Sequence, residues 1–108
     1  MGQGETNKEI GARLTLTRRA LGYDRQTEFV EALVFSVSPQ RWNNYETGHE
    51  RIPVPVALAL CDRFDLSFDW IYRAKRGELP ARVLRAIEAT EALDFRLRKL
   101  AFGGAAGK

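Results

Sequence analysis

One stretch of twelve residues decides the fold of this chain: Val37-Ser38-Pro39-Gln40-Arg41-Trp42-Asn43-Asn44-Tyr45-Glu46-Thr47-Gly48. Ser38 has the side chain of a good N-cap, and Pro39 suits the first helical position because its missing N–H would have no helical acceptor. Gly48 supplies the left-handed residue that commonly ends a helix. We therefore expect one short helix over residues 38–47.

The two faces of this helix differ in chemistry. At about 100° per residue, Trp42 and Tyr45 lie on one side, where we expect them to be buried. The opposite side carries Gln40, Asn43, Asn44 and Thr47. An amide group presents a donor and an acceptor together, as reading a base edge in the DNA major groove requires. Polar residues on an outer face are also commonly just solvated, so the segment alone leaves both interpretations open.

Composition bounds the class of protein. The chain has 108 residues, of which 44% are hydrophobic and 29% are charged, so we expect one globular domain. No apolar run approaches the length that spans a bilayer, and we expect no membrane partner. Cys61 is the single cysteine, which excludes an internal disulfide and fits a reducing, cytoplasmic location.

The distribution of charge is informative. The net charge is +3; residues 74–108 carry eight Lys and Arg against four Asp and Glu, whereas residues 36–53 carry two of each. A protein that reads nucleic acid normally shows a basic stripe. The balance around the central helix therefore counts modestly against DNA binding, and most of all against tight non-specific binding.

Two helices are expected before the central one. Thr6 and Glu9 have the spacing of a capping box, and the helix that they open ends at Gly22. A second helix begins within residues 24–26, and its inner face is predicted to hold four apolar residues: Phe29, Val30, Leu33 and Val34.

Two more helices are expected after the central one. Pro55 can open a fourth helix, whose inner face is predicted to hold Ala57, Leu60, Cys61 and Phe64. Ser67 can cap a short fifth helix. Five short helices with no strand signal predict a compact all-α domain over residues 6–73, preceded by a flexible tail, residues 1–5.

A longer helix is expected over residues 80–102, followed by a flexible tail, residues 103–108. Apolar or small residues recur along it with 4-3 spacing: Leu79, Val83, Ala86, Thr90, Leu93, Leu97 and Leu100. This stripe is either a dimerisation element or a surface that packs back on its own domain.

Three segments together resemble the phage-repressor-like (Xre/Cro-type) helix-turn-helix family. They are Gln26-Thr27-Glu28-Phe29, the central residues 38–48, and Ser67-Phe68-Asp69-Trp70-Ile71-Tyr72. The resemblance covers roughly residues 8–73. It implies a five-helix repressor-like helix-turn-helix domain, here with an added C-terminal helix.

The resemblance also implies DNA contacts. In such domains the helix equivalent to residues 38–47 lies in the major groove. Its first exposed residues and the one a turn later usually read bases, which here are Pro39, Gln40 and Asn44. Asn43 is an adjacent candidate, and Arg41 suits either a phosphate or a guanine.

Phosphate contacts and one structural pair are implied in the same way. Gln26 matches a position that bonds a phosphate, assisted by its backbone N–H, and Ser38 and Arg51 match backbone-contacting positions. Glu46 is expected to form a structural ion pair with Arg18 and not to contact DNA.

The chain departs from the family pattern at two places. The step from Gly22 to Gln26 is four residues where three are usual, and the turn over residues 33–37 is two residues longer and lacks glycine. Val30 also replaces a small residue. These differences bear on the angle between the second and third helices.

The sequence gives little support for a metal site or a phosphate-binding loop. One histidine, His49, and one cysteine, Cys61, cannot build a structural zinc site, and no glycine-rich phosphate loop is present. We expect no metal, no cofactor and no enzymatic activity.

The expected function is a sequence-specific double-stranded DNA-binding transcriptional regulator, acting as a homodimer. The alternative is a protein-interaction adaptor or antitoxin-like protein that acts through residues 80–102.

Overall fold

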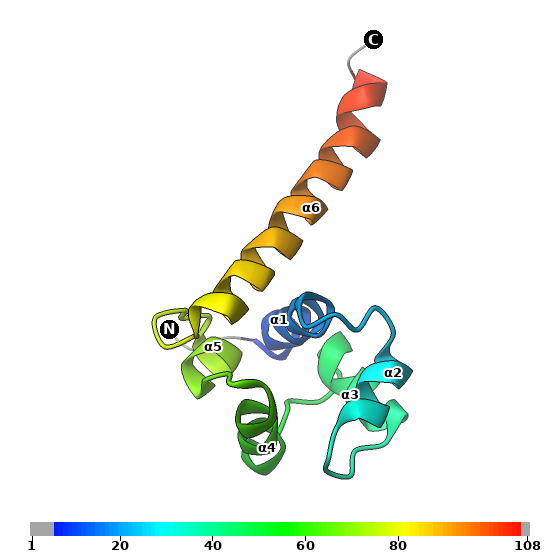
Figure 1. Cartoon of the computed structure of the whole chain (residues 1–108). Helices are drawn as coiled ribbons and strands as arrows, with labels where there is room; N and C mark the ends of the chain where they lie inside the picture. Colours follow the sequence, from blue (N-terminus) through cyan, green and yellow to red (C-terminus); the bar gives the residue numbers. More distant parts are fainter. Residues whose placement is uncertain (1–5, 107–108) are drawn as a thin grey trace.

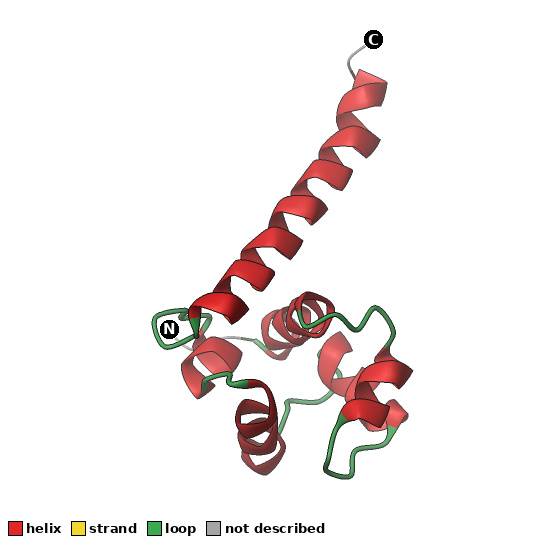
Figure 2. Ribbon diagram, viewed as in Figure 1, coloured by secondary structure: helices red, strands yellow, loops and turns green. Residues whose placement is uncertain are grey.

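The computed structural model describes residues 6–106 (Figure 1). This part of the chain is all-helical and contains no strand (Figure 2). Its helices are α1 (Asn7–Ala20), α2 (Gln26–Ala32), α3 (Pro39–Thr47), α4 (Val54–Phe64), α5 (Phe68–Arg73) and α6 (Ala81–Ala106). The expected all-α class is confirmed. The predicted tail at residues 1–5 lies outside the described residues.

Helix α1 is the centre of the fold because it packs against α3, α5 and α6 (Figure 1). Its start is the predicted capping box, in which Thr6 accepts from the backbone N–H of Glu9 and Glu9 accepts from the backbone N–H of Thr6. One apolar core joins all six helices, and its most buried large side chains are Ile10, Leu14, Phe29, Trp42, Tyr45, Ile52, Leu60, Trp70, Ile71 and Ile87.

Helix α2 is shorter than the sequence pattern indicates. It ends at Ala32, and Leu33 already has extended backbone with ψ of 141°. Leu33 still reaches the core, but Val34 is 81% exposed. The prediction that Val34 lies on a buried helical face is therefore wrong. The helix that would direct its side chain inward ends two residues earlier, at Ala32.

Helices α4 and α5 follow the predicted pattern closely. In α4, Ala57 and Leu60 are fully buried, whereas Cys61 and Phe64 are partly exposed. Ser67 caps α5, since its hydroxyl accepts from the backbone N–H of Trp70 at 3.0 Å.

Helix α6 changes its surroundings along its length. Leu79, just before it, and then Val83 and Ile87 are buried in the core, whereas the side chains from Phe95 to Ala101 are all exposed. Figure 1 shows the C-terminal half extending away from the other helices. Leu79 and Val83 of the predicted stripe thus pack on the domain, and Ala86 and Thr90 are partly buried, but the most buried side chain of α6 is Ile87, which the prediction did not include. The stripe from Leu93 onward is exposed. The helix also continues to Ala106, so residues 103–106 are helical where a flexible tail was predicted.

Two ion pairs attach α6 where its apolar contacts end. Arg76 donates twice to Glu91, at 2.6 and 2.9 Å, and Arg19 of α1 donates twice to Asp94, at 2.8 Å each. Glu91 and Asp94 lie about one turn apart, so both hold the same side of the helix.

Within residues 6–106, no helix combines the length and the apolar character needed to cross a membrane.

Candidate nucleic-acid interface

Helix α3 has the ends that its sequence predicts. The hydroxyl of Ser38 accepts from the backbone N–H of Arg41 at 3.0 Å, and Pro39 occupies the first helical position. Gly48 ends the helix with φ of 83°, in the left-handed region that glycine adopts without strain. These local signals fix where the candidate reading helix begins and ends.

The inner face of α3 is buried as predicted. Trp42 and Tyr45 are 0% and 1% exposed, and the charged Glu46 is only 8% exposed. Trp42 packs against Phe29 of α2 and against Tyr45, with ring centroids 5.0 and 5.9 Å apart. Aromatic contacts to α2 therefore set how the two helices lie against each other.

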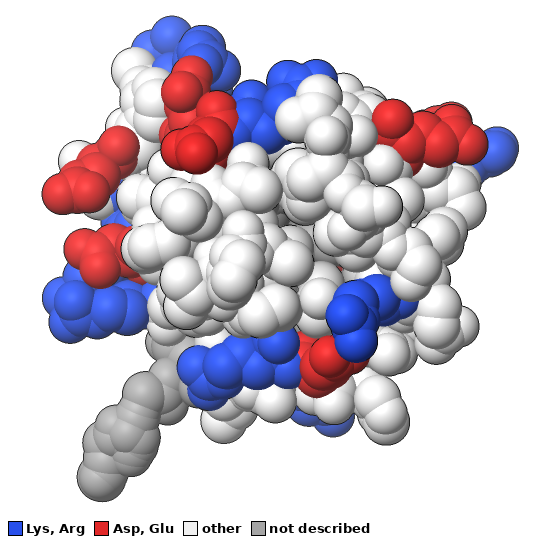
Figure 3. All heavy atoms as spheres, turned by 90° about the horizontal axis from the view of Figure 1, so that it is seen from below, with Lys and Arg blue, Asp and Glu red and all other residues white. Residues whose placement is uncertain are grey.

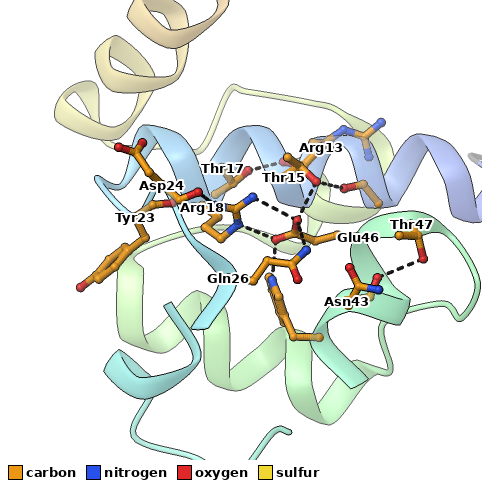
Figure 4. A network of polar contacts seen from close by, with 12 residues as sticks. Arg13, Thr15, Thr17, Arg18, Tyr23, Asp24, Gln26, Asn43, Glu46 and Thr47 are labelled. Atoms are coloured by element: carbon orange, nitrogen blue, oxygen red, sulfur yellow. Dashed lines mark hydrogen bonds and ion pairs between the residues drawn. The ribbon is translucent and has the colours of Figure 1, made fainter. Parts of the chain in front are cut away.

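The buried carboxylate of Glu46 collects donors from three helices (Figure 4). The expected ion pair with Arg18 of α1 is present, with Nε 2.7 Å from Oε2 and Nη2 3.2 Å from Oε1. Thr15 of α1 and Gln26 of α2 donate to Oε1 at 2.9 and 2.8 Å, and the indole N–H of Trp42 donates to Oε2. The carboxylate thus joins α1, α2 and α3.

This network determines the charge state of Glu46. Burial raises the pKa of the carboxyl group, but hydrogen bonds from Arg18, Gln26 and Trp42 outweigh that effect and lower the pKa below its ordinary value. Glu46 is therefore an anion at neutral pH. The remaining nitrogen of Arg18 donates to the carbonyl oxygens of Tyr23 and Asp24 at 2.8 and 2.7 Å, which ties the α1–α2 loop to the same network (Figure 4).

Sequence reasoning missed the close approach of α1 to α3. A Cβ atom built on Gly11 would lie 2.4 Å from the carbonyl oxygen of Glu46 and 2.6 Å from that of Tyr45. Only glycine fits where the two backbones come this near. A glycine in the middle of a predicted helix was the available signal, because it costs about 1 kcal/mol relative to alanine and so indicates a packing reason.

The outer face of α3 carries the predicted base-reading residues. Pro39, Gln40 and Arg41 are exposed, and Asn43 and Asn44 are partly exposed. Gln40 donates its amide N–H to the carbonyl oxygen of Asn44 at 3.4 Å, so the two amides lie side by side one turn apart. This pair still holds an acceptor on Gln40 and a donor on Asn44 with no partner within the described residues.

The two other polar groups near this face have protein partners. Thr47 donates its hydroxyl to the backbone carbonyls of Asn43 and Asn44, at 3.0 and 3.4 Å. Arg41 lies 3.8 Å from Glu50, a long and exposed ion pair that is weak. Arg41 can therefore be redirected to an external anion at low cost.

The residues expected to contact phosphates differ in their availability. Ser38 is exposed at the start of α3. Arg51 is exposed and donates from Nε to Asn7 at 2.9 Å, so it links the loop after α3 to the start of α1. Gln26, in contrast, has its amide nitrogen bonded to Glu46 inside the network. Its side chain would have to leave Glu46 before the amide could donate to a phosphate.

Charge is mixed on the face of the molecule seen from below (Figure 3). Figure 3 shows the face turned away from the C-terminal end of α6, where α4 and the α2–α3 loop lie in Figure 1. Uncharged side chains cover its middle, and both signs of charge lie around them without a continuous basic stripe. This agrees with the balanced charge of residues 36–53.

Comparisons with family models, with curated proteins and with solved structures each return no match for this chain.

Cys61 and His49 are the two side chains that the sequence offers as a nucleophile or a metal ligand. Burial, assisted by the nearby charge of Asp62, raises the pKa of the Cys61 thiol to about 11, so the thiolate that a nucleophile or metal ligand needs is scarce. His49 is exposed. Among the described residues, no three His, Cys, Asp or Glu side chains lie close enough together to hold a metal ion.

Proposed function

We propose that this chain is a sequence-specific double-stranded DNA-binding transcriptional regulator of the Xre/Cro-type helix-turn-helix family, acting as a cytoplasmic homodimer. Helix α3 enters the major groove and α2 crosses above it. The observation that carries the proposal is the division of α3 into two faces. Its inner face is locked by Trp42 and Glu46, whereas its outer face presents the paired amides of Gln40 and Asn44.

Locking matters because base reading depends on orientation. A free side-chain amide on a loosely held helix could bond many acceptors equally well, which gives no discrimination. On α3, the Glu46 network and the close contact with Gly11 fix both the rotation of the helix and its distance from α1. The outer amides are then presented from a rigid element, as specific recognition requires.

The chemistry of the outer face favours adenine. An asparagine or glutamine amide can donate to N7 and accept from N6 of adenine in the major groove, and a good pair of this kind contributes about 1–3 kcal/mol of discrimination. Gln40 and Asn44 take this role, with Asn43 beside them and Pro39 making an apolar contact. Arg41 reads a guanine or bonds a phosphate.

Affinity is expected to be modest because few cations surround α3. Ser38 and Arg51 bond the DNA backbone, and Gln26 serves mainly to hold α2 against α3. Counterion release scales with the number of phosphates neutralised, so few contacts predict a shallow dependence of affinity on salt. Two copies on a two-fold site double both sets of contacts, which is why we propose a dimer.

The test measures affinity by fluorescence anisotropy across a salt series, on selected and on scrambled duplexes. Asn44→Ala should reduce the preference for the selected duplex, whereas Arg51→Ala should weaken binding to both duplexes and lower the salt slope by about 1. Arg73→Ala is the matched control, since Arg73 is an exposed arginine of α5. An unchanged preference in Asn44→Ala would refute the base-reading assignment.

A second candidate function is a protein-interaction adaptor or antitoxin-like protein that binds its partner through α6. The exposed leucines of α6 and the balanced charge around α3 favour it. Removal of residues 95–108 separates the exposed surface of α6 from DNA reading by α3, because it spares Ile87 in the core and both ion pairs of α6. Preference for a single DNA half-site should survive the truncation; an adaptor would show no such preference in either form.

A further inference from the structure

The positive charge of the chain is concentrated near one end of α6. Residues 1–94 carry 13 Lys and Arg against 14 Asp and Glu, so their net charge is −1. Residues 95–108 carry four Lys and Arg and no Asp or Glu, so their net charge is +4. Arg96, Arg98 and Lys99 lie within residues 95–101, which we call the basic arm, and Lys108 lies outside the described residues. The part of the chain that holds α3 therefore has no net attraction for a polyanion, whereas the basic arm has.

The cations of the basic arm are accessible. Every side chain of the arm is exposed, and Figure 1 shows this part of α6 extending away from the other helices. Within the described residues, Arg96 and Arg98 form no ion pair. The ammonium of Lys99 lies 5.9 Å from the centroid of the Phe95 ring, a contact that leaves its charge uncompensated. A large partner can therefore reach all three cations.

The nearest carboxylates do not neutralise the arm. Glu91 accepts two hydrogen bonds from Arg76, at 2.6 and 2.9 Å, and Asp94 accepts two from Arg19, at 2.8 Å each. Hydrogen bonds from Arg19 lower the pKa of Asp94, and the nearby charge of Arg98 contributes to the same shift. Both oxygens of Asp94 are nevertheless bonded to Arg19. The arm thus keeps its positive charge, and the two pairs hold α6 in a fixed direction where the arm begins.

The three cations form one surface of the helix. At about 100° per residue, Lys99 lies opposite Leu97, with Arg96 and Arg98 to either side of it. All three lie within about one helical turn, and their side chains are long. The phosphates of one DNA strand follow each other about every 3.4 Å along the helix axis. Neighbouring phosphates are therefore within reach of the three cations, and each guanidinium can bond a phosphate with two N–H groups.

We propose that the basic arm binds the phosphate backbone of duplex DNA without regard to base sequence, through Arg96, Arg98 and Lys99. The inference rests on the proposed function and assigns to the arm the electrostatic attraction that the surroundings of α3 lack. Neutralised phosphates release counterions, a gain that does not depend on the bases. The contacts of α3 alone predict a shallow dependence of affinity on salt, and the arm makes it steeper.

The arm and α3 contact different phosphates. Helix α1 packs against both α3 and α6, and the arm lies beyond the part of α6 that α1 contacts (Figure 1). The two elements therefore divide the work of binding. Helix α3 selects the sequence, and the arm adds affinity for any sequence.

The distribution of apolar side chains on the arm argues against a membrane surface as the partner. A helix that lies on an anionic membrane gathers its apolar side chains on one side and inserts that side into the lipid. In the arm, Phe95 is 63% exposed and lies between Arg98 and Lys99, whereas Leu97 and Leu100 lie on the other side. Inserting either side would leave large apolar groups on the opposite one. Charge is therefore what the arm offers to a partner.

Fluorescence anisotropy with a labelled duplex of random sequence, across a salt series, tests the role of the arm in the full chain. The arm variant carries Arg96→Gln, Arg98→Gln and Lys99→Gln; glutamine is about as good a helix former as the residues that it replaces, and these side chains are exposed. Its salt slope should be lower than that of the wild type by about 3. The loss of affinity from about 50 to about 200 mM salt should then be about 40-fold smaller.

Two control variants separate the arm from charge in general and from its leucines. The charge control removes three exposed arginines that have partners within the domain, by Arg63→Gln, Arg73→Gln and Arg82→Gln. The second control, Leu97→Gln, keeps every cation of the arm. Both should bind the random duplex with the slope of the wild type. An unchanged slope in the arm variant, or an equal decrease in the charge control, would overturn the proposal.

Vesicles of phosphatidylcholine and phosphatidylserine test the membrane alternative by co-sedimentation. Wild-type binding to these vesicles that Leu97→Gln abolishes, together with duplex binding that is equal in the wild type and the arm variant, would overturn the proposal in favour of a membrane surface. Vesicle binding weaker than duplex binding, with duplex binding dependent on the three cations, is the result that we expect.

Sequence preference separates this proposal from the proposed function. The ratio of affinities for the selected and scrambled duplexes should be the same in the wild type and in the arm variant. If the wild type shows no preference but the arm variant has the lower slope, the proposed function fails and the role of the arm stands. A clear preference with an unchanged slope would contradict the role of the arm alone.

Discussion

Arg18 of α1 and Glu46 of α3 form a buried ion pair, with Nε 2.7 Å from Oε2 and the two side chains 7% and 3% exposed. Glu46 belongs to the inner face of α3, and Gln40 and Asn44 belong to the outer face. The pair therefore fixes the rotation of α3 about its own axis. Which amides face outward is decided by residues that, in our proposal, never touch DNA.

Replacing Glu46 by glutamine should cost about 3–5 kcal/mol of unfolding free energy, because it leaves the buried Arg18 guanidinium without a compensating charge. The change keeps the size of the side chain, so lost packing does not contribute. Glu50→Gln is the control: its pair with Arg41 is exposed and 3.8 Å long, and its loss should cost no more than about 1 kcal/mol. Urea unfolding followed by circular dichroism measures both, and equal losses would contradict the role given to the buried pair.

The free energy of unfolding should fall as the pH is lowered, because the same carboxylate becomes protonated. Although burial raises it, the pKa of Glu46 is lowered in the folded chain by hydrogen bonds from Arg18, Gln26 and Trp42, below the value of 4.5 for a free side chain. A lowered folded pKa gives stabilisation that is present above the unfolded pKa and is lost as pH falls through the folded pKa. Unfolding free energies measured from pH 7 downward should therefore decline below about pH 4.5, and less steeply in Glu46→Gln. Parallel profiles for the two proteins would refute this.

Gly11→Ala should destabilise the fold although alanine is the better helix former. Its Cβ would lie 2.4 and 2.6 Å from two backbone carbonyl oxygens of α3, and overpacking of this kind costs about 1–3 kcal/mol beyond the helix-propensity gain of about 1 kcal/mol. Gly77→Ala is the control, because nothing lies within 4 Å of a Cβ built there. Thermal unfolding compares them. A Gly11→Ala chain as stable as Gly77→Ala would show that α1 and α3 can separate freely.

Two tyrosines should respond differently to removal of the hydroxyl group. The Tyr45 hydroxyl is buried and has no hydrogen-bond partner among the described residues, whereas the Tyr72 hydroxyl donates to the carbonyl oxygen of Ile52 at 2.8 Å. Tyr45→Phe should therefore stabilise the chain by about 1 kcal/mol or leave it unchanged, and Tyr72→Phe should destabilise it by about 1 kcal/mol. A clear loss of stability in Tyr45→Phe would mean that a partner, such as a bound water, satisfies that hydroxyl.

Local signals in the sequence were enough to predict α3 and its buried side. The Ser38 cap, the Gly48 end and the inward positions of Trp42 and Tyr45 depend on neighbours within a few residues, and the structure has all of them. The burial predicted for Val34 was wrong because it assumed that α2 continues past Ala32. The extended backbone of Leu33 ends the helix there.

Contacts between distant segments were harder to predict. The 4-3 spacing along α6 correctly includes Leu79 and Val83 but misses Ile87, which is fully buried whereas the predicted Ala86 is only partly buried. The spacing also does not show that the domain ceases to cover the helix after Ile87. The internal bond from Gln26 to Glu46 and the approach of Gly11 to α3 depend on how three helices meet. The pair of Arg18 with Glu46 was expected only through the family resemblance.

Selection of bound duplexes from random DNA tests the central claim most directly, since it reports binding, sequence preference and half-site spacing together. We predict that the wild type enriches a two-fold site whose half-sites lie about one helical turn apart, with adenine at the positions facing Gln40 and Asn44. The same selection with Asn44→Ala should lose the preference at one position of each half-site. No enrichment by the wild type, or an identical motif from Asn44→Ala, would contradict the account.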